Sequence, residues 1–431
     1  MLEITESVAA SVQASVNQND LKNIVANPVN TELLPIVIVG TGYAGYGLAK
    51  ALRERNPEQP IIMFSNDNGD HYSKPALSNA LARDKEADHL ILETLMEVEQ
   101  RLSIRIYANC QVQGIDQQQH LVHSAMGVVK YAKLVLAQGA APIRLGFAGT
   151  GASEVLSVND LRDYRQFRQL LDKTDKAQNS LEATRKKTHV TIIGSGLIGC
   201  EFANDLAGKG YQVVVIGLAD WAMNRLLPQE IGQQLQQKLS ALGVAWQLAN
   251  SVETIDKLAE QQGYLLRLAD GKQLKTDIVL SAVGLKARTE LAKSAGVACD
   301  SAIIVNGGLR TNVQDIYALG DCAQIQGRLQ PFIAPINHSI QALANCLIGK
   351  PTMAQYPLMP VIVKTPAFAI TLLSPLPEQF AQGSWKIESN TSEGVSSMRG
   401  LFVDEQGQLL GFVLTGECVN ERQQWLDKVV R

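Results

Sequence analysis

Two stretches decide the fold: residues 35–49 read PIVIVGTGYAGYGLA, and residues 189–203 read HVTIIGSGLIGCEFA. Each begins with β-branched residues, passes through Gly-x-Gly-x-x-Gly and continues as an apolar helical pattern. One such motif is weak evidence, but two copies 154 residues apart, each in strand–turn–helix context, predict two dinucleotide-binding folds. The predicted fold class is therefore α/β, with two Rossmann-like domains.

The first glycine loop has the residues that a dinucleotide needs. Gly40 permits the tight turn, Gly42 lets the backbone approach a pyrophosphate, and Gly45 allows the helix to pack closely on the strand. Tyr43 and Ala44 lie in the same loop, where the first free N–H groups of the helix would face the phosphates.

Asp67 lies 22 residues beyond Gly45, just after a predicted strand at 60–65. An acid at this distance can accept hydrogen bonds from a ribose diol. A turn aspartate in the sequence SNDNG is the alternative interpretation. The distance from the glycine motif favours the ribose-binding role.

The second glycine loop repeats the pattern at Gly194, Gly196 and Gly199, followed by a predicted strand at 211–217. That strand ends in Gly217, no acid follows before Asp220, and no arginine stands nearby for a 2′-phosphate. These residues leave the choice between NADH and NADPH open. The repulsion expected from Asp220 favours NADH.

Composition excludes several other classes of protein. The net charge of −3 gives no electrostatic footprint for nucleic acid. The uncharged run at residues 33–49 is shorter than a membrane span and rich in glycine. The six cysteines and six histidines lack metal-ligand or redox spacing, so we expect no metal site and a reducing, cytoplasmic location.

The second half of the chain adds a further motif and then changes in composition, with more proline. Residues 311–322 read TNVQDIYALGDC, in which Gly320 and Asp321 end a strand and suit a ribityl-and-phosphate site. Further strands are predicted at 133–137, 277–283, 303–305, 368–372 and 409–414. Prolines cluster between 331 and 366, and residues 356–431 mix strand and helix patterns, as in a small α/β domain.

Together these motifs resemble the FAD/NAD(P)-dependent pyridine-nucleotide oxidoreductase family. The glycine loops, AQG at 137–139, AVG at 282–284 and YALGD at 317–321 carry the resemblance, which runs from about residue 34 to the C-terminus. It implies a glutathione-reductase-like architecture of four parts. These are a flexible N-terminal arm (1–33), a discontinuous FAD-binding domain (34–155 and 285–355), an NAD-binding domain (156–284) and a C-terminal domain (356–431).

Within that family, the segments YSKP at 72–75, GCEFANDL at 199–206 and VKTP at 363–366 resemble rubredoxin–NAD reductases of alkane-oxidising bacteria. The resemblance implies NADH on the second glycine loop and Gly284. It implies FAD contacts on the first glycine loop and on Asp67, Lys74, Val112, Glu201, Asp321, Ile333 and Lys364. Periodicity alone would assign Val112 and Ile333 to an ordinary core.

The same resemblance gives roles to three charged residues. It implies that Lys74 and Glu201 meet beside the flavin, where the glutamate holds a cation that favours electron density on the ring. Lys364 would balance the negative charge of the reduced flavin. The alternative for each lysine is an ordinary surface position, since lysine is rarely buried unpaired.

No pair of cysteines follows the first fold, so a thiol relay is not expected, and Cys200 and Cys322 are interpreted as buried structural thiols. The expected activity is transfer of electrons from NADH through FAD to rubredoxin, which would in turn supply an alkane hydroxylase. The alternatives are a ferredoxin or flavorubredoxin reductase and a flavin-binding, NADH-responsive interaction protein. In a helical stretch predicted at 160–171, Arg162, Arg165 and Arg168 form one candidate docking face for an acidic rubredoxin, and a solvated helix is the alternative. The polar segment 172–188 that follows, with a charged run at 185–187, is expected to be an exposed connection.

Overall fold

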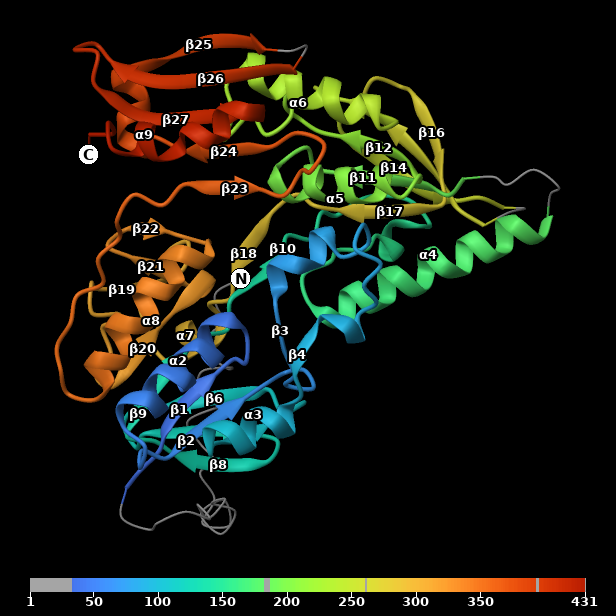
Figure 1. Cartoon of the computed structure of the whole chain (residues 1–431). Coiled ribbons are helices and arrows are strands. Elements are labelled where there is room, and N and C mark those ends of the chain that lie inside the picture. Colours follow the sequence, from blue (N-terminus) through green and yellow to red (C-terminus); the bar gives the residue numbers. More distant parts are fainter. Residues whose placement is uncertain (1–32, 182–186, 260–261, 393–394, 431) are drawn as a thin grey trace, which may run out of the picture. The chain divides into compact units, whose positions relative to one another are not determined.

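The computed structural model describes residues 33–181, 187–259, 262–392 and 395–430 (Figure 1). The predicted arm at 1–33 lies outside them, apart from Leu33. The chain forms two compact units. Of the described residues, the first unit comprises 33–72, 92–140 and 286–356, and the second comprises those within 73–91, 141–285 and 357–430.

A parallel sheet forms the centre of the first unit, with the strand order β20-β9-β1-β2-β5. Its strands are β1 (Ile36–Val39), β2 (Ile61–Phe64), β5 (Arg105–Tyr107), β9 (Lys133–Leu136) and β20 (Ile316–Ala318). β1, β2 and β20 are buried along their whole length, as expected for a sheet covered on both faces. The predicted strands at 60–65 and 133–137 are thereby confirmed.

Helices and smaller sheets complete the first unit. The helices are α2 (Tyr43–Arg55), α3 (Leu95–Leu102), α7 (Glu290–Ser294) and α8 (Ile333–Leu347). An antiparallel meander contains β6 (Val112–Asp116), β7 (Leu121–Ser124) and β8 (Gly127–Lys130). A further sheet contains β19 (Ile303–Val305), β21 (Ala323–Ile325) and β22 (Arg328–Leu329). α2 and α8 pack so closely that a Cβ at Gly47 would lie 2.5 Å from Ile340 Cδ1.

The chain passes between the units along four short strands. These are β3 (His71–Tyr72), β4 (Ile91–Glu93), β10 (Ala140–Pro142) and β18 (Leu285–Ala287).

The second unit contains a parallel sheet of order β13-β12-β11-β17 and two antiparallel sheets. The parallel strands are β11 (His189–Ile193), β12 (Gln212–Ile216), β13 (Val244–Gln247) and β17 (Ile278–Ser281), with helices α5 (Leu197–Gly208) and α6 (Gln229–Ala241). β14 (Val252–Lys257), β15 (Tyr264–Leu268) and β16 (Gln273–Thr276) form one antiparallel sheet. The other has the order β23-β24-β27-β26-β25: β23 (Val361–Val363), β24 (Ile370–Leu373), β25 (Gly383–Ser392), β26 (Val395–Asp404) and β27 (Leu409–Thr415), followed by α9 (Arg422–Leu426).

One prediction about the connection before the second glycine loop is wrong. Residues 172–188 were expected to be an exposed connection, but α4 (Leu161–Leu181) continues through more than half of them (Figure 1). Tyr164, Phe167, Leu171 and Thr174 are all buried, and their spacing of three and four residues keeps them on one helical face. The polar composition of this stretch reflects the opposite, exposed face. Arg185 and Lys186 of the charged run lie outside the described residues.

Candidate functional site

The first glycine loop is shaped by close backbone contacts. Gly40 has a φ of +120°, and a Cβ there would lie 2.3 Å from the carbonyl oxygen of Ala137. A Cβ at Gly45 would lie 2.0 Å from the carbonyl oxygen of Gly40. At Gly42, by contrast, an added Cβ would meet nothing within 4 Å. Gly40 and Gly45 therefore serve the packing of the protein itself, whereas the space at Gly42 suits a ligand.

The second glycine loop repeats this geometry within the second unit. Gly194 has a φ of +119°, and a Cβ there would lie 2.5 Å from the carbonyl oxygen of Ala282. A Cβ at Gly199 would lie 1.9 Å from the carbonyl oxygen of Gly194, while the space around Gly196 is open to 4 Å. Gly284, which ends the AVG motif, has a φ of +116°. The internal repeat predicted from the sequence is confirmed in three dimensions.

Both loops lead into helices whose first N–H groups are not capped by side chains. α2 begins after Gly42 and α5 after Gly196, neither cap residue offers a side-chain hydrogen bond, and neither first turn carries an acid. The positive end of the helix dipole and the free N–H groups suit a phosphate. The residues present thus fit the pyrophosphates of FAD and NADH, with Tyr43 and Ala44 in the first turn of α2.

Asp67 lies just beyond β2 and is connected to the first glycine loop by hydrogen bonds. Its Oδ1 accepts from Ser65 Oγ at 2.5 Å and from the Gly69 amide at 2.9 Å. Ser65 Oγ is in turn 2.5 Å from Thr41 Oγ1. Oδ1 of Asp67 therefore shapes the turn, and the carboxylate lies next to the first glycine loop. Its ribose-binding role stays a prediction.

The Gly320–Asp321 segment also reaches this loop, although it is remote in sequence. It forms a short 3₁₀ turn directly after β20. Gly320 has a φ of +79°, and a Cβ there would lie 2.9 Å from the Cβ of Ala44. The first unit thus brings Asp321 beside the first turn of α2. Val112 begins β6 and is buried, and Ile333 begins α8 and is half-buried.

In the second unit, Glu201, Lys364 and Ser78 form a polar cluster. Glu201 is 2% exposed, and its Oε2 pairs with Lys364 Nζ at 2.8 Å and accepts from Ser78 Oγ at 2.6 Å. Lys364 Nζ also donates to Ser78 Oγ at 2.7 Å and to the Pro75 carbonyl at 2.5 Å. The Lys364 amide donates to Glu201 Oε1 at 3.1 Å. One ammonium group is therefore fixed by three oxygens.

This cluster adds a partner that the sequence did not indicate. The resemblance implied that Lys74 meets Glu201, and the structure shows an ion pair between Glu201 and Lys364. The role of Lys74 stays a prediction. Lys74 begins the 3₁₀ helix η2 (Lys74–Asn79), which also supplies Ser78. No local sequence signal indicates this role of Ser78, because its partners Glu201 and Lys364 are remote from it in the chain.

A second buried carboxylate holds the chain that follows η2. Asp205 on α5 accepts hydrogen bonds from the amides of Leu81 at 3.0 Å and Ala82 at 2.8 Å. Burial raises the pKa of Asp205 to about 6, and the two amide hydrogen bonds oppose that rise. Glu201 and Asp205, one helical turn apart, thus both bind the 73–91 segment to α5.

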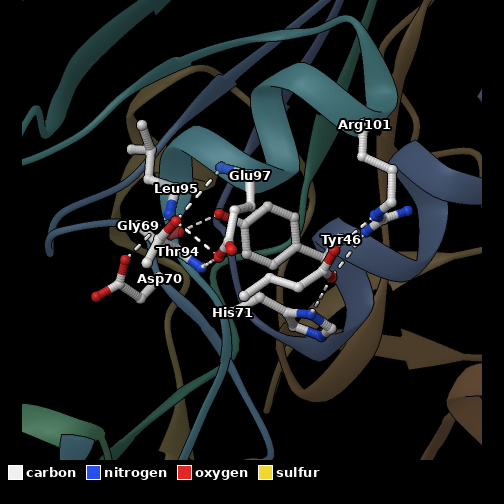
Figure 2. A network of polar contacts seen from close by, with 9 residues as sticks. Tyr46, Gly69, Asp70, His71, Thr94, Leu95, Glu97 and Arg101 are labelled. Atoms are coloured by element: carbon white, nitrogen blue, oxygen red, sulfur yellow. Dashed lines mark hydrogen bonds and ion pairs between the residues drawn. The ribbon is translucent and has the colours of Figure 1, made fainter.

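In the first unit, a polar network holds the β3–β4 pair (Figure 2). Glu93 accepts from Arg101 Nε at 2.6 Å and Nη2 at 2.8 Å, and lies 3.2 Å from His71 Nδ1. The hydrogen bond from Arg101 lowers the pKa of Glu93, and His71 adds to this effect. His71 also packs edge-on against Tyr46 of α2. The network fixes the strand from which the chain leaves toward Lys74.

The arginines considered as a docking face are all engaged in ion pairs. Arg165 pairs with Asp88 at 2.6 Å, Arg168 with Glu86 at 2.5 Å, and Arg162 with Asp160 at 3.6 Å. The side chain of Arg168 is only 12% exposed. These contacts favour the alternative of a solvated helix balanced by acids.

The cysteines are free, and the two in the motifs are buried as predicted. Burial raises the pKa of the Cys200 thiol to about 12 and that of Cys322 to about 11. Both thiols therefore stay protonated at neutral pH, which makes them poor nucleophiles.

We expect Cys200→Ala and Cys322→Ala to retain NADH-dependent reduction of ferricyanide, because neither thiol ionises at neutral pH. Each change removes a packed sulfur and should cost roughly 0.5–3 kcal/mol of stability. Steady-state turnover and thermal denaturation measure the two effects. A folded, flavin-loaded double variant without turnover would reveal a thiol relay.

The chain is similar to known proteins over most of its length. A family model described as pyridine nucleotide-disulphide oxidoreductase matches residues 34–342, and one described as rubredoxin binding C-terminal domain matches residues 353–429. The chain is 40% identical to the rubredoxin–NAD(+) reductase of Acinetobacter baylyi, over 92% of this chain and 98% of that protein. It is 34% identical to the nitric oxide reductase FlRd–NAD(+) reductase of Aeromonas hydrophila subsp. hydrophila, over 89% of this chain and 93% of that protein.

Among solved structures, the chain is similar to a ferredoxin reductase from Rhodopseudomonas palustris. The TM-score is 0.78 at 25% identity, covering 92% of this chain and 95% of the other. Within the described residues, no helix combines the length and apolar character that crossing a membrane requires.

These matches confirm the predicted resemblance, the two-Rossmann α/β fold class, the oxidoreductase class and the use of FAD and NAD. The match covers the two glycine loops, the AQG and AVG motifs and Asp321. The chain belongs to the pyridine nucleotide-disulphide oxidoreductase family.

Proposed function

We propose that the protein is an NADH-dependent reductase that passes electrons through FAD to rubredoxin. One observation supports the proposal above all. The same chain contains two glycine loops with open space at Gly42 and Gly196, and a C-terminal segment that matches a rubredoxin-binding model. The similarity to rubredoxin–NAD(+) reductases over nearly the full length supports it. FAD supplies the conversion of a two-electron hydride donor into single electrons for an iron protein.

The residues around the loops have distinct proposed roles. Gly40, Gly42 and Gly45 with α2 would hold the FAD pyrophosphate, and Asp67 and Asp321 would accept from its sugar hydroxyls. Gly194, Gly196, Gly199 and Gly284 would hold NADH. Lys74, Val112 and Ile333 remain proposed flavin contacts.

Glu201 has the role of fixing a cation. Its carboxylate, with Ser78 and the Pro75 carbonyl, holds the Lys364 ammonium in one position. A cation fixed in this way lowers the free energy of added negative charge without reorganising during the reaction. We therefore propose that Lys364, held in place by Glu201, balances negative charge on the reduced flavin together with Lys74.

We expect NADH to be preferred over NADPH. β12 ends at Ile216, where Gly217 is followed by Leu218, which is 83% exposed, and by the exposed Asp220. Residues 217–220 include no cation for a 2′-phosphate, so NADPH should lose at least about tenfold in kcat/KM, or 1.4 kcal/mol. Steady-state kinetics with both nucleotides measures the ratio. Equal values would contradict the prediction.

The acceptor is tested by stopped-flow reduction with NADH followed by mixing with oxidised rubredoxin, a [2Fe–2S] ferredoxin or the rubredoxin domain of a flavorubredoxin. We expect fast oxidation of the reduced flavin by rubredoxin and slow oxidation by ferredoxin. Preference for the flavorubredoxin domain would indicate a flavorubredoxin reductase, as in the name of the Aeromonas relative. A long-lived reduced flavin with every acceptor would instead favour an NADH-responsive interaction protein.

The setting of the reaction is part of the same proposal. The six free cysteines suit a reducing compartment, so we propose a cytoplasmic location, a monomer and an alkane hydroxylase as the final consumer of electrons. We also propose the domain division into 34–155 with 285–355 for FAD, 156–284 for NAD and 356–431 for the partner.

A further inference from the structure

The C-terminal sheet of the second unit carries a hollow of about 420 Å³. Strands β23 and β24 form one side, and the 3₁₀ helix η7 (Gly416–Glu421) and α9 form the other. The side chains that decide its chemistry are those of Ile362, Thr371, Val419, Asn420, Arg422 and Gln423. The whole lining lies within the segment that matches the rubredoxin-binding model.

The lining combines aliphatic side chains, two amides and one cation. Ile362 is 60% exposed, on the outermost strand of its described sheet. Among the described residues that line the hollow, Arg422 is the only charged one. An exposed aliphatic side chain beside an arginine and amides is typical of protein interfaces.

Arg422 differs from its neighbours in being available to a partner. Glu421 accepts from Arg399 Nε at 2.6 Å and from Trp425 Nε1 at 2.9 Å, and Asp427 accepts from Gln423 at 2.7 Å. Arg422 is exposed and forms no ion pair within the part of the chain that the structure describes. Its guanidinium can therefore bind a carboxylate of another protein.

The hollow is also next to the charged cluster along the chain. Val363 lines it, and the next residue, Lys364, is bound by Glu201. At about 3.3 Å per residue along a strand, the Cα atoms of Ile362 and Lys364 are separated by roughly 7 Å. A redox protein seated on Ile362 would thus lie close to the lysine that we propose balances charge on the flavin.

We propose that rubredoxin docks in this hollow, with Ile362 packing against an apolar side chain of the partner and Arg422 pairing with one of its carboxylates. This inference rests on the proposed function and specifies its partner surface. Rubredoxins are typically small and acidic, so a single unneutralised arginine beside an exposed aliphatic side chain complements them. The paired arginines of α4 do not offer such a cation.

The test uses the full-length, FAD-loaded protein and the variants Arg422→Glu and Ile362→Ser. Arg267→Glu and Ile304→Ser are matched controls, because Arg267 is exposed on β15 and Ile304 is 42% exposed on β19. For each protein, the rate of rubredoxin reduction is divided by the rate of ferricyanide reduction in the same preparation. This ratio removes differences in flavin content and in NADH oxidation.

We expect Arg422→Glu and Ile362→Ser each to lower the ratio about tenfold, and Arg422→Glu also to weaken its dependence on salt, because the variant removes a steering charge. Both controls should keep the wild-type ratio. Wild-type ratios in both hollow variants would overturn the docking site and leave the proposed function standing. A wild-type protein that reduces ferricyanide but not rubredoxin would overturn both.

Discussion

Replacement of Gly42 by alanine is expected to leave the first unit folded and to remove most of its affinity for FAD. The backbone at Gly42 has a φ of −74°, which any residue adopts, and an added Cβ meets no protein atom within 4 Å. The space is instead where a pyrophosphate would approach the N-terminus of α2. Each charge-assisted hydrogen bond lost there costs about 1.5–3 kcal/mol, or at least tenfold in affinity.

Two further variants make this result interpretable. Gly45→Ala places a Cβ 2.0 Å from the Gly40 carbonyl oxygen and should destabilise the unit itself. Gly114→Ala in β6 meets nothing within 4 Å and should change neither stability nor flavin content. Flavin content after dialysis and thermal denaturation separate the three cases. A Gly42→Ala protein that retains FAD as tightly as the wild type would refute the role of this cradle.

The second large effect is expected for Glu201→Ala, which should destabilise the second unit by about 3–5 kcal/mol. The change removes the acceptor of Ser78 Oγ, of the Lys364 amide and of the Lys364 ammonium. Because the Lys364 side chain is 29% exposed, water can solvate part of the orphaned charge, which favours the lower end of this range. Urea denaturation measures the loss, and Glu253→Ala, at an exposed position on β14, serves as control.

A double-mutant cycle with Lys364→Met tests whether the ion pair is the cause. If it is, Lys364→Met should be much less costly in the Glu201→Ala background, because the orphaned charge is then gone. Glu201→Gln should fall between the wild type and Glu201→Ala, since the amide keeps one oxygen for Ser78. Strictly additive losses would show that Glu201 and Lys364 act independently.

Local sequence patterns determine the glycine loops and the strands that lead into them. The demand for glycine at Gly40, Gly45, Gly194 and Gly199 comes from backbone contacts over short segments, and the repeat makes each copy confirm the other. The same holds for the parallel strands, whose β-branched residues are buried on both faces. For this reason the fold class and both cofactor-binding glycine loops could be predicted from the sequence alone.

Only the tertiary structure decided which side chains meet. The ion pair between Glu201 and Lys364 joins residues 163 positions apart, and Ser78 reaches Glu201 across 123. No spacing rule covers such distances, since folding sets them through packing of whole elements. The pairing of the α4 arginines with Glu86 and Asp88 was hidden for the same reason, because the acids belong to another segment. Helix α4 extends past its predicted end at residue 171. Burial of one helical face, from Tyr164 to Thr174, stabilises the helix although the sequence around it is mostly polar.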